Sequence, residues 1–301
     1  MARTELYKRR SYVLVYKTDM KPIEDYVRSL TLFDLFIEFD TFVAIQGEFL
    51  NNSDYVVIMA QMWFTPPSNS AITNLIFLNV EHLTEQNRMK HVRGLIETKI
   101  PIADYSETNL KLLQSFADQH GVRLYHLPYQ YDLSEQTGLH PTATDEFLYD
   151  IGIVNADPVT DGETKSKRSK VWCELVNTNH SVCNIKGWGA ERDALINQCR
   201  IILNVHHFDC FCIFEHVRCD RLLFAGKLVV SESSFDMENL DVRAAVVWTN
   251  YADIVTTVDT VLDKFELFRE RTAQPCLMKQ VVADRKLKLQ QVVYEIEAAC
   301  S

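Results

Sequence analysis

The sequence of 301 residues lacks two kinds of targeting segment. It contains no run of about 18 apolar residues, the length that crosses a bilayer as a helix. Its first residues are basic, but no apolar stretch with a small-residue cleavage site follows them, as it would in a secretory signal. Both absences predict a soluble, cytoplasmic chain. No cysteine precedes Cys173, and in such a chain we expect the eight cysteines to be reduced thiols.

Basic residues are also few. The chain has 31 Lys and Arg against 41 Asp and Glu, which gives a formal net charge of -10. Phosphate backbones repel such a chain, so nucleic acid is not expected as a partner. The hydrophobic content of 47% is sufficient for a core and excludes a disordered or collagen-like chain. The length favours two domains or one large α/β unit.

An Asp-x-Asp pair is absent as well. Enzymes that hold a diphosphate through a divalent metal commonly need clustered carboxylates, so we expect Lys, Arg and helix N-termini to supply positive charge instead. The stretch 206–212 (HHFDCFC) has several metal-ligating residue types, but no second ligand pair at zinc-site spacing lies near it. We therefore expect no metal, and we expect His206 to line a cleft at the end of its strand.

Short apolar runs alternate with amphipathic segments, which is typical of βα units that build parallel sheets. A segment with two prolines and a glycine at 128–144 separates two such series. We predict a Rossmann-like lobe at 1–128, a second lobe at 129–268, and a closing C-terminal helix within 269–301 that either packs across both lobes or binds a partner. The expected strands are 12–16, 35–39, 41–46, 55–60, 74–79, 122–126, 147–154, 181–185, 200–206, 227–231 and 244–248. The expected helices are 21–30, 106–120, 164–175, 190–198, 212–225, 251–268 and 277–299.

A glycine-rich turn opens one helix of the second lobe. Gly187, Trp188 and Gly189 precede the helix start, and Arg192 occupies the place of the third glycine of a dinucleotide fingerprint. The turn is therefore a weak candidate for NAD. It remains either an anion-binding loop, because a helix N-terminus has unpaired N–H groups, or a plain connection.

Charged side chains gather at two other helices of this lobe. Glu215, Arg218 and Arg221 are spaced at i, i+3 and i+6 on a helix that follows the strand ending at His206, and they form either a ligand site or a surface ion pair. A basic cluster near the first helix start of the lobe would either bind phosphate or form a solvated face; it consists of Lys165, Lys167, Arg168 and Lys170.

Four stretches of the second lobe resemble, in order, the CgeB-like glycosyltransferases of the GT-B fold: 189–193 (GAERD), 201–206 (IILNVH), 214–218 (FEHVR) and 225–232 (AGKLVVSE). The stretch 149–155 looks like the first strand and loop of that family's nucleotide lobe. The stretches 79–83, 104–109 and 125–128 look like parts of its acceptor lobe. Small transferases of large DNA viruses look similar. The sequence departs from the retaining pattern of two glutamates eight residues apart, because Leu223 stands eight residues after Glu215.

The resemblance implies an α/β, GT-B-like fold of two Rossmann-like lobes whose parallel sheets face a central cleft. It implies transfer of a sugar from a nucleotide-diphosphate sugar, with a UDP-sugar slightly favoured, to a hydroxyl of a glycan or glycoprotein acceptor. Neither a metal nor any cofactor beyond the donor is expected. The residues expected to bind the donor are Gly152, Asn155, Lys167, Arg168, Gly187, Trp188, Arg192, His206, Glu215 and Arg218.

Position along the first lobe indicates an acceptor site. The segments 55–60 and 74–79 are expected to be neighbouring parallel strands, so the residues just beyond them would face the crevice. Trp63 and Phe64 offer an aromatic surface for a sugar or pack on their own lobe. If the reaction inverts, Glu81 or His82 is the expected base, and His206 is the third candidate catalytic residue.

Two other functions remain open. The missing second glutamate favours a non-catalytic descendant that serves as a binding or scaffold protein, whereas the cluster of Glu215, Arg218 and His206 opposes it. A nucleotide-sugar epimerase of the same fold is the other alternative. The sequence leaves the donor sugar, the nucleotide base, the acceptor, the stereochemical outcome and the oligomeric state open.

Overall fold

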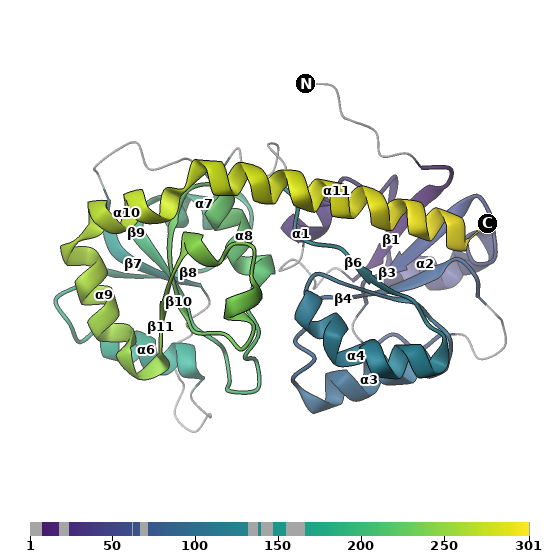
Figure 1. Ribbon diagram of the computed structural model, residues 1–301, viewed down its shortest axis with the longest axis horizontal. Coiled ribbons are helices and arrows are strands. Elements are labelled where there is room, and N and C mark those ends of the chain that lie inside the picture. The colour runs from purple at the N-terminus through teal and green to yellow at the C-terminus, as the bar shows by residue number, and fades with distance from the viewer. Residues whose placement is uncertain are drawn as a thin grey trace. The chain divides into compact units, whose positions relative to one another are not determined.

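The computed structural model describes residues 8–17, 24–61, 63–66, 72–131, 138–139, 147–154 and 166–300. The chain divides into two compact units. Unit 1 comprises 1–132 together with 282–301, and unit 2 comprises 133–281. Each unit is built around a single parallel sheet (Figure 1). The long C-terminal helix α11 (Pro275–Ala299) is divided between the two units.

Unit 1 contains a six-stranded sheet in the order β2-β1-β3-β4-β5-β6, with every neighbouring pair parallel. Its elements before α11 are β1 (Ser11–Tyr16), α1 (Glu24–Ser29), β2 (Leu35–Glu38), α2 (Phe39–Ile45), η2 (Gln46–Glu48), β3 (Tyr55–Met59), β4 (Leu75–Asn79), α3 (Gln86–Glu97), β5 (Ile102–Asp104), α4 (Glu107–His120) and β6 (Leu124–His126).

Unit 2 contains a five-stranded sheet in the order β11-β10-β9-β7-β8, again all parallel. Its elements before α11 are β7 (Tyr149–Val154), α6 (Lys167–Leu175), β8 (Val182–Ile185), α7 (Ala190–Asn197), β9 (Cys199–Asn204), α8 (His216–Phe224), β10 (Leu228–Glu232), η3 (Met237–Asn239), η4 (Arg243–Ala245), β11 (Val246–Thr249), η5 (Tyr251–Asp253), α9 (Ile254–Asp263) and α10 (Phe265–Ala273).

The two sheets share one strand order. In each unit the first strand lies between the second and the third, and the later strands follow the third outward. The direction of winding therefore reverses beside the first strand, between β1 and β3 in unit 1 and between β7 and β9 in unit 2. Ligands of open α/β sheets bind at the carboxyl ends of the strands at such a reversal. The topology thus indicates one ligand crevice in each unit.

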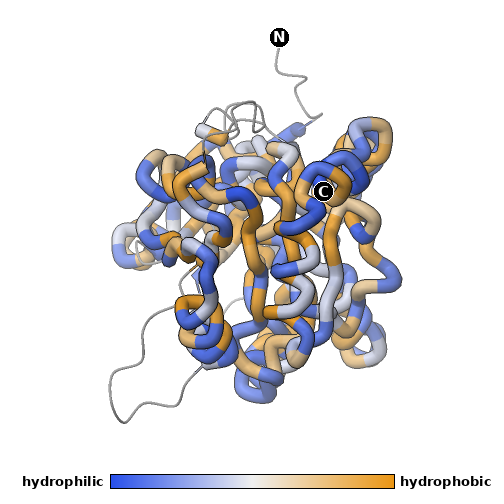
Figure 2. The backbone as a smooth tube through the Cα atoms, turned by 90° about the vertical axis from the view of Figure 1, so that its left-hand side faces the viewer, coloured by the Kyte–Doolittle hydropathy of each residue, from blue (hydrophilic) through white to orange (hydrophobic). Residues whose placement is uncertain are grey.

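The core of unit 2 has two layers, one on each face of the sheet. Alternate strand residues face α6, α9 and α10 on one side, and α7, α8 and the start of α11 on the other. Figure 2 shows the strands as hydrophobic segments flanked by helices of mixed hydropathy. In unit 1, helices α2, α3 and α4 cover one face of the sheet.

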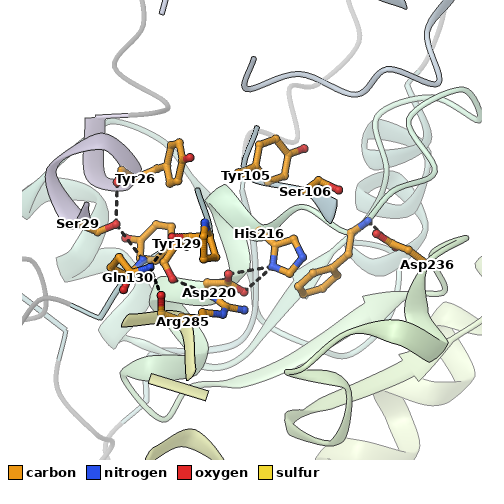
Figure 3. Close-up of polar contacts among 12 residues, drawn as sticks. Tyr26, Ser29, Tyr105, Ser106, Tyr129, Gln130, His216, Asp220, Asp236 and Arg285 are labelled. Carbon is orange, nitrogen blue, oxygen red and sulfur yellow. Dashed lines mark hydrogen bonds and ion pairs between the residues drawn. The ribbon is translucent and has the colours of Figure 1, made fainter. Parts of the chain in front are cut away.

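The last part of α11 is bonded to unit 1. The amide of Gln130 donates to the carbonyl of Arg285 at 3.2 Å, and the buried Arg285 guanidinium donates to the carbonyl of Tyr129 at 3.0 Å (Figure 3). Farther along α11, the guanidinium of Arg10 donates to the carboxylate of Glu297 at 3.0 Å and to the carbonyl of Cys300 at 2.9 Å. These bonds join the C-terminal segment to the residues that follow β6 and to the residue that precedes β1.

Most expected elements form, and the expected pairing of the segments 55–60 and 74–79 is confirmed, because β3 and β4 are parallel neighbours. The expectation of a strand at 41–46 is wrong, since α2 occupies these residues. The carboxylate of Glu38 accepts hydrogen bonds from the N–H groups of Asp40 and Thr41, so it caps a helix there. This cap outweighs the β-propensity of the apolar residues.

Helix α3 and strand β5 had no sequence prediction, and one expected helix is divided. Helix α3 carries few apolar residues and begins at a Glu85 cap, and β5 is only three residues long. The expected helix at 251–268 is interrupted at Lys264, whose φ of -117° and ψ of 35° separate α9 from α10. None of the helices in the described part of the chain combines the length and the apolar content that a membrane crossing requires.

Candidate functional site

The candidate site of unit 2 lies at the carboxyl ends of β9 and β10, beside the reversal between β7 and β9. Helix α6, which follows β7, and helix α8, which follows β9, both begin at this edge. The charged and polar residues gathered there are called the donor cluster below, after the donor-binding role that the sequence predicts for most of them; they are Lys167, Arg168, Asn204, His206, Glu215, Arg218 and Glu232.

The centre of the donor cluster is a carboxylate between two guanidinium groups. Arg168 donates to Oε1 of Glu215 at 2.7 Å, and Arg218 donates to Oε2 at 2.6 Å. Arg168 also donates to the carbonyl of Val205 at 2.7 Å, and Arg218 donates to the side chain of Asn204 at 3.1 Å. One negative and two positive charges leave this group of three with an excess positive charge, which suits an anionic ligand.

Burial affects the electrostatics of this group. Arg168 is buried, and desolvation, followed by the charge of Arg218, lowers the pKa of its guanidinium to about 10. The side chain remains charged at neutral pH. An additional anion would stabilise a buried cation that has a like charge beside it, so this group of three favours a negatively charged ligand.

Lys167 forms the second part of the donor cluster. Its ammonium contacts the carboxylates of Glu232 and Asp209, the latter at 3.0 Å, and lies 4.5 Å from the centre of the Tyr251 ring. Burial alone lowers the pKa of Lys167, but the hydrogen bonds to Glu232 and Asp209 outweigh burial and leave the pKa raised. The side chain of Asp209 is 94% exposed, so an incoming anion can replace it at little cost.

His206 lies in the middle of the donor cluster. Its backbone N–H donates to Oε2 of Glu232 at 3.1 Å, and its ring Nε2 lies 3.3 Å from the hydroxyl of Ser234. Desolvation lowers the pKa of this buried imidazole despite the nearby carboxylates of Glu215 and Glu232. A neutral ring at pH 7 positions neighbours by hydrogen bonds and contributes no charge.

Glu232 is a member of the cluster that sequence reasoning missed. It ends the buried strand β10 and accepts from both Lys167 and the His206 N–H. The sequence did contain a signal for Glu232, which is an acidic residue directly after the run LVVS. Such a position is a strand end, and strand ends face the ligand crevice in this class of fold.

Two exposed aromatic rings beside the cluster were also missed. Phe208 follows β9, and Phe235, which is 75% exposed, follows β10. Their loops are joined, because the N–H of Phe235 donates to the carbonyl of Cys212 at 2.8 Å and the N–H of Phe214 donates to Asp236 at 3.0 Å. Exposed aromatic rings on two loops that are hydrogen-bonded to each other are suited to pack against a sugar or a base.

His216 and Asp220 form a further pair at the start of α8. The ring Nδ1 of His216 lies 2.9 Å from Oδ2 of Asp220, which is fully buried (Figure 3). Their i, i+4 spacing on a predicted helix was the signal that could have found them.

The structure places the other predicted donor residues of unit 2 apart from this centre. Gly187, Trp188 and Arg192 follow β8, and β7 lies between β8 and β9. The guanidinium carbon of Arg192 lies 6.0 Å from the centre of the Trp188 ring. Gly187 and Gly189 have φ values of 82° and 60°, so the turn needs glycine at both positions.

Gly152 lies inside the sheet on β7. A Cβ atom there would approach Ile185 Cδ1 to 2.6 Å and Cys199 Sγ to 2.8 Å, so the missing side chain makes room for neighbouring strands. This position explains the glycine by packing. Asn155 and Lys165 lie outside the described residues.

In unit 1, Glu81 and His82 follow β4 as expected. The amide of Asn79 donates to the carbonyl of Glu81 at 2.8 Å and to the buried carboxylate of Asp104 at 2.6 Å, and the amide of Asn109 donates to the same carbonyl at 2.9 Å. The Glu81 carboxylate is paired with Arg88, and His82 is buried. The backbone of this turn is therefore held firmly at the carboxyl edge of the sheet.

The expected aromatic pair is split. Phe64 is buried in the core of unit 1 and meets Phe39 edge to face at 6.4 Å, as the packing alternative predicted. Trp63 is 53% exposed, has a φ of 62°, and lies 5.3 Å from the ring of His91. Only Trp63 offers its ring to solvent.

Metal ligands do not gather in the described residues: no group of three or more His, Cys, Asp or Glu side chains there is arranged to hold an ion. The eight cysteines are free thiols.

Comparison with known proteins gives viral relatives. No protein-family model matches the sequence. The chain is 28% identical to uncharacterized protein L137 of Acanthamoeba polyphaga mimivirus over 253 residues, which is 83% of this chain and 32% of that protein. It is 30% identical to uncharacterized protein L140 of the same virus over 191 residues, 61% of this chain and 58% of that protein. The chain thus spans about a third and just over half of these two relatives.

A solved structure shares the fold. Sucrose-phosphate synthase from Thermosynechococcus elongatus matches with a TM-score of 0.56 and 8% sequence identity, over 97% of this chain and 96% of that chain. At this identity the likeness is one of fold. Two α/β units, each with a parallel Rossmann-like sheet, are consistent with the predicted GT-B fold, whereas membership of the CgeB-like family stays a prediction.

Proposed function

We propose that this protein is a metal-independent glycosyltransferase that moves a sugar from a nucleotide-diphosphate sugar to an acceptor hydroxyl. The observation that supports it most is the donor cluster itself. Arg168, His206, Glu215 and Arg218 come from three separate segments, were predicted from the sequence for donor binding, and meet at the reversal of the unit 2 sheet. The sucrose-phosphate synthase fold agrees with this proposal.

The chemistry follows from the charges. Transfer of the sugar leaves a nucleoside diphosphate whose negative charge grows as the glycosidic bond breaks, and preorganised cations stabilise that charge. Arg168 and Arg218 provide the positive excess, and Lys167 exchanges the exposed Asp209 for a phosphate oxygen. Glu215 keeps lone pairs that accept hydrogen bonds from sugar hydroxyls. A UDP-sugar is the donor tested first.

The acceptor is proposed to bind unit 1. His82 and Glu81 lie after β4, where a base could take the proton of the acceptor hydroxyl, and the exposed ring of Trp63 suits the apolar face of a glycan. The proposed acceptor is a glycan or glycoprotein, the proposed family is the CgeB-like one, and the proposed location is the cytoplasm.

The first experiment measures donor binding by thermal shift with UDP, GDP, CDP and dTDP sugars. A ligand at 100 times its dissociation constant stabilises the folded state by about 2.7 kcal/mol. The variant with Lys167→Ala and Arg168→Ala should lose this stabilisation, whereas Lys170→Ala, on the exposed side of the same helix, should keep it. Equal donor affinity of the double variant and the wild type would contradict the site. EDTA should leave turnover intact, and activity recovered by manganese or zinc after EDTA would contradict metal independence.

A non-catalytic binding protein is the second candidate, and one observation favours it. Leu223, eight residues after Glu215, is buried in the hydrophobic core, so position 223 supplies no second carboxylate. Absence of binding for every donor would favour this candidate. Epimerisation of a bound donor without acceptor would favour an epimerase.

A further inference from the structure

Unit 2 has a cavity at the β11 edge of its sheet, away from β7. Strand β11 is the edge strand, and a cavity of about 520 Å³ lies against it, walled by η4, α9 and α10. It reaches from the residues before β11 to Trp248, whereas the donor cluster follows the carboxyl ends of β9 and β10. No residue of the donor cluster lines it.

The charged residues that line this cavity are both arginines, Arg243 and Arg271. Among the described residues the structure records no ion pair or side-chain hydrogen bond for the guanidinium of Arg271. Arg243 pairs with Glu238 at 2.9 Å, but both side chains are more than half exposed, so water screens this pair and an anion can replace the glutamate. On a chain with a net charge of -10, a cavity whose charged lining residues are both cations favours a negatively charged ligand.

The remaining lining is mostly apolar. It includes Val247, Trp248 and Phe268, together with the polar residues Thr257, Thr272 and Gln274. The indole N–H of Trp248 donates to the carbonyl of Arg243 at 2.9 Å, which holds the ring in place before a ligand arrives. A volume of about 520 Å³ falls within the roughly 300–1,000 Å³ typical of small-molecule sites and exceeds what a bare inorganic anion fills.

We propose that this cavity binds a small organic anion that carries a planar ring and one phosphate or carboxylate group. The ring packs on the apolar lining of the cavity, and the anionic group pairs with Arg271 and Arg243. The site is separate from the donor cluster, and the inference does not depend on the glycosyltransferase proposal. Because the cavity joins η4, β11 and α10, an occupant stabilises unit 2 where α10 leads into α11.

The test uses phenyl phosphate, benzoate, phenol and inorganic phosphate as probes, with dissociation constants from isothermal titration. A ring joined to an anionic group should bind at least about tenfold more tightly than phenol or inorganic phosphate alone. Comparing phenyl phosphate with benzoate identifies which anion the site prefers. Phenol as tight as both anionic probes, or no binding of either anionic probe, overturns the proposal.

Two matched variants locate the binding. Arg271→Gln should weaken the preferred probe by about tenfold or more, since a charge-assisted hydrogen bond is lost. Arg269→Gln, two residues away and paired with Glu266 instead of lining the cavity, should leave it unchanged. If Lys167→Ala abolishes probe binding and Arg271→Gln does not, the probe occupies the donor cluster and the cavity proposal is wrong, while the proposed function is unaffected.

Discussion

Arg168 and Glu215 are 47 residues apart in the chain, and their side chains are joined by a hydrogen bond of 2.7 Å. Arg168 lies in the first turn of α6, which follows β7, and Glu215 directly precedes α8, which follows β9. Strands β7 and β9 are neighbours although β8 lies between them in the sequence. The crossover of the fold thus creates the pair, and it brings Arg168 close to the like charge of Arg218.

Replacing Glu215 by Gln should damage both stability and donor turnover. The substitution leaves two buried or partly buried guanidinium groups with a neutral partner, and breaking such a pair costs about 3–5 kcal/mol. Urea unfolding measures the stability, and donor consumption measures the activity. Glu266→Gln removes one partner of the more exposed pair with Arg269 and should cost less than about 1 kcal/mol. If both variants lose a similarly small free energy of unfolding, the Glu215 pair contributes no more to stability than an exposed ion pair.

The pH dependence of stability should reflect His206. Burial lowers the pKa of this imidazole below its ordinary value of about 6.5, so below that pH the unfolded chain binds a proton that the folded protein does not yet bind. The free energy of unfolding therefore falls as the pH falls from 6.5, and this loss ends once the pH is below the pKa of the folded state. His206→Gln should flatten this part of the curve, measured by urea unfolding at several pH values. An unchanged slope would show that His206 is not desolvated.

Two glycine substitutions should shift stability in opposite directions. Gly152→Ala places a Cβ within 2.6 Å of Ile185 Cδ1 in the middle of the sheet and should cost about 1–3 kcal/mol. Gly94→Ala, on helix α3, meets nothing within 4 Å and should gain up to about 1 kcal/mol, because alanine is the better helix former. Denaturant unfolding of both variants checks the signs. A neutral Gly152→Ala would mean that Gly152 is not needed for packing.

If the reaction inverts, His82→Ala should lower transfer by about 10²–10⁴-fold, the usual contribution of a general base. Glu81→Gln should have a smaller effect on transfer, because the Glu81 carboxylate is already paired with Arg88. Donor hydrolysis without acceptor, which is proposed to depend on unit 2, serves as the control for folding in both variants. Full transfer by both variants would remove the unit 1 base and leave a retaining mechanism or another site.

The repeated βα pattern was sufficient to predict the parallel sheets, because buried parallel strands read as short apolar runs. The segments that carry Arg168, His206 and Glu215 were also predictable, since each follows a strand, and strand ends face the ligand crevice in open α/β sheets. The pairing of Arg168 with Glu215 was not predictable, because it depends on which strands are neighbours. Periodicity does not reveal strand order.

Other sequence expectations depended on neighbours that the sequence does not show. Gly152 was expected at the donor, and the structure shows that the side chains of Ile185 and Cys199 occupy the space that a side chain there would need. Phe64 was expected at the acceptor or in the core, and only the packing of Phe39 shows that it lies in the core. The strand expected at 41–46 failed because a capping bond from Glu38 is a local interaction that apolar patterning does not include.

The division of α11 has a consequence for the order in which the protein is completed. Unit 1 contains 282–301 as well as the first 132 residues, and all of unit 2 lies between them in the chain. During synthesis, unit 2 therefore emerges whole before unit 1 receives Arg285 and Glu297, the partners of Tyr129 and Arg10. Until Arg285 and Glu297 are synthesised, the segment 1–132 of unit 1 lacks its contacts with α11. A nascent chain stalled near residue 281 would therefore be more vulnerable to proteases in 1–132 than in 133–281.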